Sequence, residues 1–190
     1  MQRPLIYAAL PLACAFLLAP SAEARVKRDL STLDLSQAEQ SLGRGGPELK
    51  VIASKGGDVG TFFGGRGVGY LTDSLYMGGA GYGGTMSGTG VVGGFGYGGL
   101  VVGAEGKIAG PFGYEASLLL GGGGGSGTRT SGGSFVLEPS VSLRQDFGGG
   151  VSGALSAGYL FAPNADALSG AIVGLRLDFK TLTLTLPVEN

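Results

Sequence analysis

Glycine constrains this chain more than any other residue type. The sequence has 41 glycines in 190 residues, all of them between Gly43 and Gly174, and many lie inside apolar segments that otherwise resemble β-strands. Glycine makes up about 7% of an ordinary soluble protein, and it weakens the interior of a strand. A chain that places glycine at every second residue of its strands therefore either brings two backbones close together or curves its sheet sharply.

Residues 1–24 read as a secretory signal peptide. Arg3 supplies the positive charge, an apolar run extends from Pro4 to Pro20, and Ala22-Glu23-Ala24 matches a small-x-small cleavage site. We predict that the mature chain begins at Arg25. Two alternatives are an uncleaved membrane anchor and a lipidated Cys14, because Leu12-Ala13-Cys14 resembles part of a lipobox.

Composition excludes several kinds of site. Histidine is absent, and Cys14 is the only cysteine and leaves with the signal peptide. The mature chain therefore lacks cysteine nucleophiles, histidine bases, disulfides and metal sites built from histidine or cysteine. The 13 basic and 14 acidic residues are near balance, so no basic face is indicated and no nucleic-acid partner is expected. The length of the mature chain suits one domain.

Residues 25–47 form a leader that differs from the rest of the chain. They hold most of the clustered charge and few glycines, and Leu30, Leu33, Ala38 and Leu42 recur with a loosely helical spacing. We expect a leader that is either flexible or a short helix, and it serves either export or docking. Residues 48–190 then form a glycine-rich β domain.

The β domain is predicted to be all-β. Short apolar stretches broken by Gly, Asn, Asp and Ser predict about eight strands. They are Leu49–Ser54, Gly60–Thr72, Leu75–Met86, Gly96–Ala109, Phe112–Gly121, Phe135–Phe147, Val151–Phe161 and Gly170–Phe179. Most connections are too short for a crossover helix, so neighbouring strands should pair as an antiparallel meander. Two glycine-rich links, Ser87–Gly94 and Gly121–Gly133, are expected to be mobile loops.

One glycine motif occurs twice. Gly78–Gly84 recurs as Gly93–Gly99, and both copies match the G-x-G-x-x-G pattern of dinucleotide-binding proteins. That pattern binds a dinucleotide only between a strand and a following helix, whereas strand-like sequence follows both copies here. We therefore predict two adjacent strands with matched glycine tracks, each carrying one tyrosine, and a close approach at Gly81 and Gly96.

Alternation along the strands favours a closed membrane barrel. In Phe135–Phe147 and Gly170–Phe179, one face is apolar and the other combines glycine, serine and charges of both signs. The strands are close to the length that crosses a bilayer, and the polar faces contain little lysine. We therefore predict a small closed barrel with lipid outside. Its candidate lumen ion pairs are formed by Arg66, Glu105, Lys107, Glu115, Glu138, Arg144, Asp146, Arg176 and Asp178.

The strand Gly174-Leu175-Arg176-Leu177-Asp178-Phe179 resembles the last strand of small bacterial outer-membrane β-barrels. The resemblance implies an outer-membrane location, contact with membrane lipid, and recognition by the barrel assembly machinery through Gly174–Phe179. The chain continues through an alternating segment, so Lys180–Val188 is an alternative last strand. Phe63–Gly67 and Gly78–Gly84 also resemble stretches of glycine-rich exported proteins, a resemblance that implies no activity.

No group of residues indicates catalysis or a cofactor. Glu105 with Lys107, or Glu138 with Arg144 and Asp146, could form acid–base sets, but structural ion pairs explain them equally. The tyrosines at positions 76, 82, 97 and 114 fit carbohydrate stacking, an interfacial belt or ordinary packing. We predict a non-enzymatic outer-membrane barrel with a structural, surface-exposed or narrow-pore role. The alternative is a secreted or periplasmic β-sandwich that acts as a binding or matrix protein.

Overall fold

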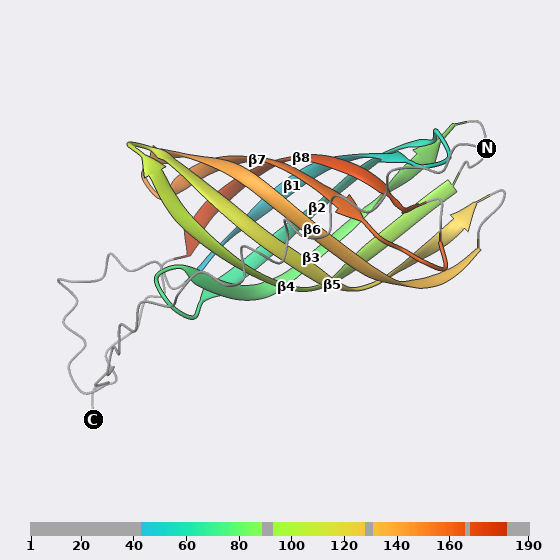
Figure 1. The fold of residues 1–190 in the computed structure, drawn as a ribbon, viewed down its shortest axis with the longest axis horizontal. Coiled ribbons are helices and arrows are strands. Elements are labelled where there is room, and N and C mark those ends of the chain that lie inside the picture. Colours follow the sequence, from blue (N-terminus) through green and yellow to red (C-terminus); the bar gives the residue numbers. More distant parts are fainter. Residues whose placement is uncertain (1–42, 89–92, 128–130, 166–167, 182–190) are drawn as a thin grey trace, which may run out of the picture. The chain divides into compact units, whose positions relative to one another are not determined.

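One antiparallel sheet closes on itself as an eight-stranded barrel (Figure 1). The structure is a computed structural model and describes residues 43–88, 93–127, 131–165 and 168–181. The strands are β1 (Gly43–Ser54), β2 (Val59–Tyr70), β3 (Leu75–Ser87), β4 (Gly93–Ala109), β5 (Phe112–Gly127), β6 (Ser131–Gly148), β7 (Val151–Leu160) and β8 (Gly170–Thr181).

The strands pair in chain order, and β8 closes the barrel against β1. The pairing is staggered. A row of paired residues that starts at Ser142 of β6 passes through Gly174 and Lys50 and returns to β6 at Gly132. Such a stagger tilts the strands relative to the barrel axis. The closed sheet confirms the predicted all-β meander and shows that the alternative, a two-sheet sandwich, is wrong.

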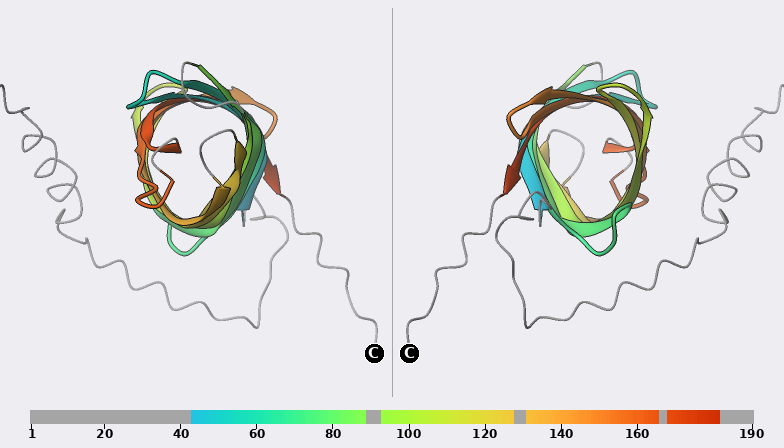
Figure 2. Two further views of the ribbon diagram at one scale, coloured as in Figure 1. Left: turned by 90° about the vertical axis from the view of Figure 1, so that its right-hand side faces the viewer. Right: turned by 90° about the vertical axis from the view of Figure 1, so that its left-hand side faces the viewer.

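The two ends of the barrel differ. At one end, called here the turn end, β1 begins, β8 finishes, and the connections are residues 71–74, 110–111 and 149–150. At the other, called the loop end, the longest connection is residues 161–169, between β7 and β8. Figure 2 views the barrel along its length and shows this connection inside the outline of the wall.

Several expected boundaries are wrong. β1 begins at Gly43, so residues 43–47 are strand rather than leader. The expected loop Gly121–Gly133 is largely strand, because Gly122–Gly125 of β5 pair with Gly132–Phe135 of β6. Gly93 and Gly94 likewise belong to β4. Backbone hydrogen bonds need no side chain, so glycine runs extend these strands. The signal peptide, residues 25–42 and residues 182–190 lie outside the described residues.

Glycine is sterically required at inward positions of β2 and β3 but not at several outward ones, although outward glycines elsewhere, such as Gly45 and Gly98, are also confined by backbone. An added Cβ at the inward Gly64 would lie 1.9 Å from the carbonyl oxygen of Gly81, and one at Gly84 would lie 2.1 Å from that of Thr61. At the outward Gly81 and Gly83, a Cβ would meet nothing within 4 Å. The close approach predicted at Gly81 is therefore wrong, whereas at Gly96 an added Cβ would lie 3.3 Å from the carbonyl oxygen of Tyr82. The matched tracks are present, since Tyr82 pairs with Tyr97 across β3 and β4.

Candidate functional site

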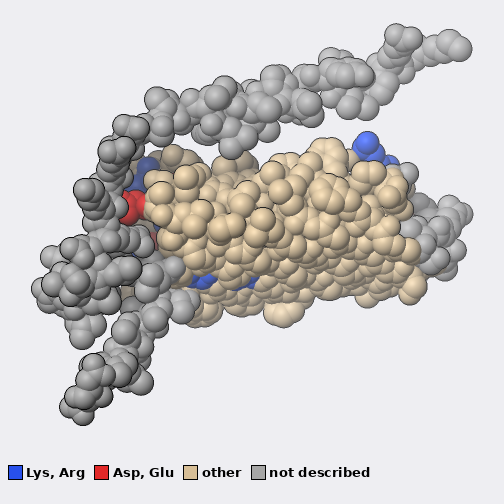
Figure 3. All heavy atoms as spheres, turned by 90° about the horizontal axis from the view of Figure 1, so that it is seen from below, with Lys and Arg blue, Asp and Glu red and all other residues tan. Residues whose placement is uncertain are grey.

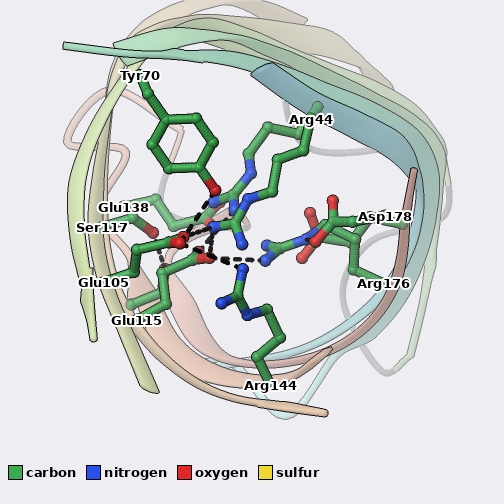
Figure 4. A network of polar contacts seen from close by, with 12 residues as sticks. Arg44, Tyr70, Glu105, Glu115, Ser117, Glu138, Arg144, Arg176 and Asp178 are labelled. Carbon is green, nitrogen blue, oxygen red and sulfur yellow. Dashed lines mark hydrogen bonds and ion pairs between the residues drawn. The ribbon is translucent and has the colours of Figure 1, made fainter. Parts of the chain in front are cut away.

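The lumen is the candidate site, because the alternation of the strands points nearly all described buried charges into it. Its centre is Glu115, whose side chain is fully buried. Arg66 Nη2 lies 2.6 Å from Glu115 Oε1, and Arg176 Nη2 lies 2.9 Å from Oε2. Arg44 pairs with the same carboxylate. Three strands besides β5 are thereby tied to one side chain (Figure 4).

Glu105 is a second centre of ion pairs beside Glu115. We call the group formed by Arg44, Arg66, Glu105, Glu115, Arg144, Arg176 and Asp178 the charged layer. Arg44 Nη2 lies 2.5 Å from Glu105 Oε2 and Arg144 Nη1 lies 3.2 Å from Glu105 Oε1. The Tyr70 hydroxyl donates a hydrogen bond of 3.0 Å to Oε1. Asp178 accepts a bond of 2.8 Å from Arg176 Nε. Burying a charge is costly unless it is paired and hydrogen-bonded. Glu105, Glu115 and Asp178 are each in an ion pair and each accept at least one hydrogen bond, although Glu105 Oε2 and Asp178 Oδ1 accept none.

A smaller polar cluster lies next to the charged layer. Lys50 Nζ lies 2.6 Å from Glu138 Oε1 and 3.6 Å from the centre of the Tyr82 ring. The Tyr82 hydroxyl donates a hydrogen bond of 2.6 Å to Glu48 Oε2. Glu48, Lys50 and Glu138 line a small cavity together with Ser117 and Ser140. The cavity has room for about one water molecule.

Apolar side chains fill the lumen towards the loop end. The chain leaves the wall after Phe161 and turns inward, which buries Ala162, Ala165 and Leu168. They pack in one cluster with side chains from the wall, among them Ile52, Phe62, Met86, Phe95, Val136, Leu160 and Ile172. We call this cluster the apolar layer. Within the described residues, the lumen therefore holds two layers of buried side chains in series, one charged and one apolar.

The structure brings most of the predicted lumen residues together. Arg66, Glu105, Glu115, Glu138, Arg144, Arg176 and Asp178 all lie inside and form ion pairs. Lys107 is exposed, and Asp146 is half-buried and accepts a hydrogen bond from the backbone N–H of Gly148. These two lie near the turn end, where the wall meets solvent, and no ion pair joins them to another described residue.

Sequence reasoning missed Arg44, Glu48 and Lys50, which β1 places in the lumen. The expected leader boundary at residue 47 removed Arg44 from the barrel. A usable signal was present in the sequence, because Glu48 and Lys50 alternate with the outward Leu49 and Val51. The tyrosines at 76, 82 and 97 are buried inside, whereas Tyr114 is exposed on the exterior.

The exterior of the barrel carries no charge at its strand positions. In all eight described strands, every outward residue is apolar, glycine or an uncharged polar residue, and the barrel wall in Figure 3 is accordingly mostly uncharged. Exposed large apolar side chains occur on every strand, including Phe63, Leu100, Val141, Leu155 and Leu175. Most outward aromatic residues lie near the turn end (Phe112, Tyr114, Phe147, Phe179) or near the loop end (Phe135, Tyr159, Phe161), and the exposed Phe63 lies within β2.

A bilayer is the environment that stabilises such a surface. Soluble monomers rarely expose apolar patches beyond a few hundred Å², whereas membrane barrels combine an apolar outer band, aromatic girdles and a polar interior. The chain therefore has the architecture of a small outer-membrane β-barrel. Within the described residues, no helix is long and apolar enough to cross a membrane. No group of acidic side chains there is arranged to hold a metal ion.

Comparisons with known proteins find similarity only to solved structures. No protein family matches the sequence, and no curated protein matches it either. The fold is similar to a designed transmembrane β-barrel, with a TM-score of 0.44 and 8% identity over 75% of this chain and 98% of the other. It is also similar to Ail, the attachment invasion locus protein of Yersinia pestis, with a TM-score of 0.45 and 13% identity over 72% of this chain and 93% of Ail.

Proposed function

We propose that this protein is a non-enzymatic β-barrel of the bacterial outer membrane, with a structural or surface-exposed role. One observation carries the proposal: the strands place their buried charges in the lumen and none on the outward face. A charge on the lipid face of a barrel costs about 2–4 kcal/mol at the midplane, so a membrane barrel excludes charge from this face. On the surface of a soluble protein the same charges would lie in water, so nothing would exclude them from the outward face.

Membrane lipid is the first partner that this surface fits. The barrel assembly machinery is a second proposed partner, through Gly174–Phe179. In that segment Leu175, Leu177 and Phe179 are exposed on the outward face of β8, where another protein can reach them. The segment also lies on the strand that closes the barrel against β1.

The lumen favours a structural or surface-exposed role over a narrow pore. The apolar layer blocks the lumen towards the loop end, and Phe62 and Leu160 in it are fully buried. The charged layer blocks the other half with side chains that are already paired. An ion in transit would have to break these pairs and then cross an apolar region.

Cell fractionation tests the proposal. We expect the mature protein in the outer-membrane fraction, soluble only with detergent, and with a gel mobility that changes when the sample is boiled, because a closed barrel resists unfolding in mild detergent. A mature protein that stays in solution without detergent would exclude a membrane barrel. Fractionation into the inner membrane would contradict the proposed location but not the fold.

A further inference from the structure

The wall of the barrel is uneven at the loop end, because β6 extends beyond the end of its neighbour β7. β6 begins at Ser131, but its regular pairing with β7 starts only at Ser140, opposite Gly158. Beyond that point a single bridge joins Leu137 to Phe161. The chain then turns into the lumen, where Ala162 is fully buried. No other described strand takes the place of β7 beside residues 131–136 of β6.

The hydrogen bonds of the bridge show which backbone groups of β6 face this gap. The N–H of Leu137 donates to the carbonyl of Phe161 over 3.0 Å, and the N–H of Phe161 donates to the carbonyl of Leu137 over 2.8 Å. Residues two apart in a strand direct their N–H and C=O groups to the same side. Ser131, Gly133 and Phe135 therefore direct their backbone groups away from β5 and into the gap. The carbonyl of Phe135 accepts a hydrogen bond of 2.9 Å from the Ser134 hydroxyl, so the groups of this segment that can bind a partner are chiefly the N–H groups of Gly133 and Phe135. We call this segment, residues 131–135, the β6 edge.

The β6 edge lies in water if the barrel spans a membrane, since unpaired backbone groups do not occur in hydrocarbon. The composition around the β6 edge is consistent with its position in water, because few apolar side chains occur there. Glycine and serine dominate Gly121–Gly127 of β5 and Ser131–Ser134 of β6. Natural sheets protect exposed edges with charged residues or proline. The β6 edge has neither, and the exposed Gly133 and Phe135 leave it accessible.

We propose that the β6 edge binds an extended peptide segment of a partner protein by strand addition. The N–H groups of Gly133 and Phe135, spaced two residues apart on one side of a strand, are complementary to the carbonyl groups of another extended backbone. The lack of charge along the edge favours an uncharged segment, and Phe135, which is 56% exposed on the outward side, favours an apolar partner residue beside it. The bound segment would continue the sheet in the position that β7 vacates.

A second copy in the same membrane does not fit this edge. Two copies would be related by a two-fold axis along the membrane normal, which preserves the direction of every strand along that normal. Strands of such barrels tilt by about 35–45°, so the two β6 strands would cross at a large angle and could not pair as neighbours. The occupant is therefore a segment of another protein.

Hydrogen exchange of the full-length protein in detergent micelles tests the proposal independently of where the protein lies in the cell. The probe is a synthetic Ser-Val-Thr-Val-Ser-Val peptide, which is uncharged, prone to form a strand and not a segment of this chain. In the free protein we expect the amides of Gly133 and Phe135 to exchange rapidly while that of Val136, which faces β5, is protected. Binding of the peptide should slow hydrogen exchange of the Gly133 and Phe135 amides. The same peptide N-methylated at alternate residues cannot form the hydrogen bonds of a strand and should leave their exchange unchanged. Protected Gly133 and Phe135 amides in the free protein, or equal effects of the two peptides, would overturn the proposal.

Variants at Gly133 provide the matched control. Gly133→Pro removes one donor that faces the gap and none that faces β5, so we expect peptide affinity to fall about tenfold, the factor that one hydrogen bond supplies. Gly133→Ala keeps the donor, and its Cβ would meet only the carbonyl oxygen of Gly123 at 3.7 Å, so its affinity should be unchanged. If Gly133→Pro does not fold, Gly133→Lys places a charge on the edge and should weaken binding instead. Unchanged binding by the folded variants contradicts strand addition.

Discussion

At the scale of single residues, the most consequential side chain is Glu115. Its carboxylate is the shared partner of Arg44, Arg66 and Arg176. Each guanidinium is almost completely buried, so removing the carboxylate leaves positive charges close together without compensation. Breaking a buried ion pair from one side is far more destabilising than replacing the whole pair.

We therefore expect Glu115→Gln to lower the free energy of unfolding by about 3–5 kcal/mol. Urea unfolding in phospholipid vesicles measures it. Lys107→Gln is the matched control, because Lys107 is exposed and in no described ion pair, and a surface substitution of this kind changes stability by about 0.5 kcal/mol or less. Equal losses in the two variants would show that the charged layer contributes little to stability.

Two glycines of β2 separate the effects of the inner and outer faces of the wall. Gly64→Ala would place a Cβ 1.9 Å from the Gly81 carbonyl oxygen, whereas Gly67→Ala meets nothing within 4 Å. We expect Gly64→Ala to prevent formation of the heat-modifiable barrel. Gly67→Ala should be neutral or stabilising by up to about 1 kcal/mol, because alanine loses less conformational entropy than glycine. A folded Gly64→Ala variant of unchanged stability would contradict the steric role of the inward glycines.

At the scale of the strands, the alternation of side chains was the part of the sequence that predicted structure best. The alternation identified the eight strands, and it predicted that the side chains of Glu115, Arg144 and Arg176 point into the lumen, because burial on one face of a sheet repeats every second residue. It could not locate strand ends in glycine runs such as Gly121–Gly125, where no side chain marks a face. It also could not show that Arg44 and Glu115 meet, since the stagger of the closed sheet brings β1 and β5 to the same level.

The outward face of the strands can be tested with leucines. Leu143 of β6 and Leu177 of β8 are exposed on the barrel wall, whereas Leu160 of β7 is fully buried in the apolar layer. Leu160→Ala should cost about 2–5 kcal/mol, because it leaves a cavity. Leu143→Ala and Leu177→Ala should each cost less than half of that, since acyl chains fill the space. Unfolding titrations in vesicles compare the three. Losses at Leu143 and Leu177 equal to that at Leu160 would indicate a packed core on the outer face.

At the scale of the whole molecule, two layers of buried side chains, one charged and one apolar, fill the described part of the lumen. A pore would require both layers to open, and the two open by different means. The charged layer depends on ion pairs with Glu115, and the apolar layer depends on large side chains such as Phe62, Phe95 and Leu160. A substitution in one layer therefore leaves the other in place.

Conductance across planar bilayers tests this arrangement. We expect no ion conductance from the wild-type protein, and none from Glu115→Gln, because the apolar layer still blocks the lumen. The double variant Phe62→Ala, Leu160→Ala should also remain closed, because the paired charges fill the other half. Only the triple variant that combines these substitutions should conduct, provided that its gel mobility shows a folded barrel. Discrete, stable conductance from the wild-type protein would show that both the charged layer and the apolar layer open to ions. That result would favour a narrow-pore role over a structural one.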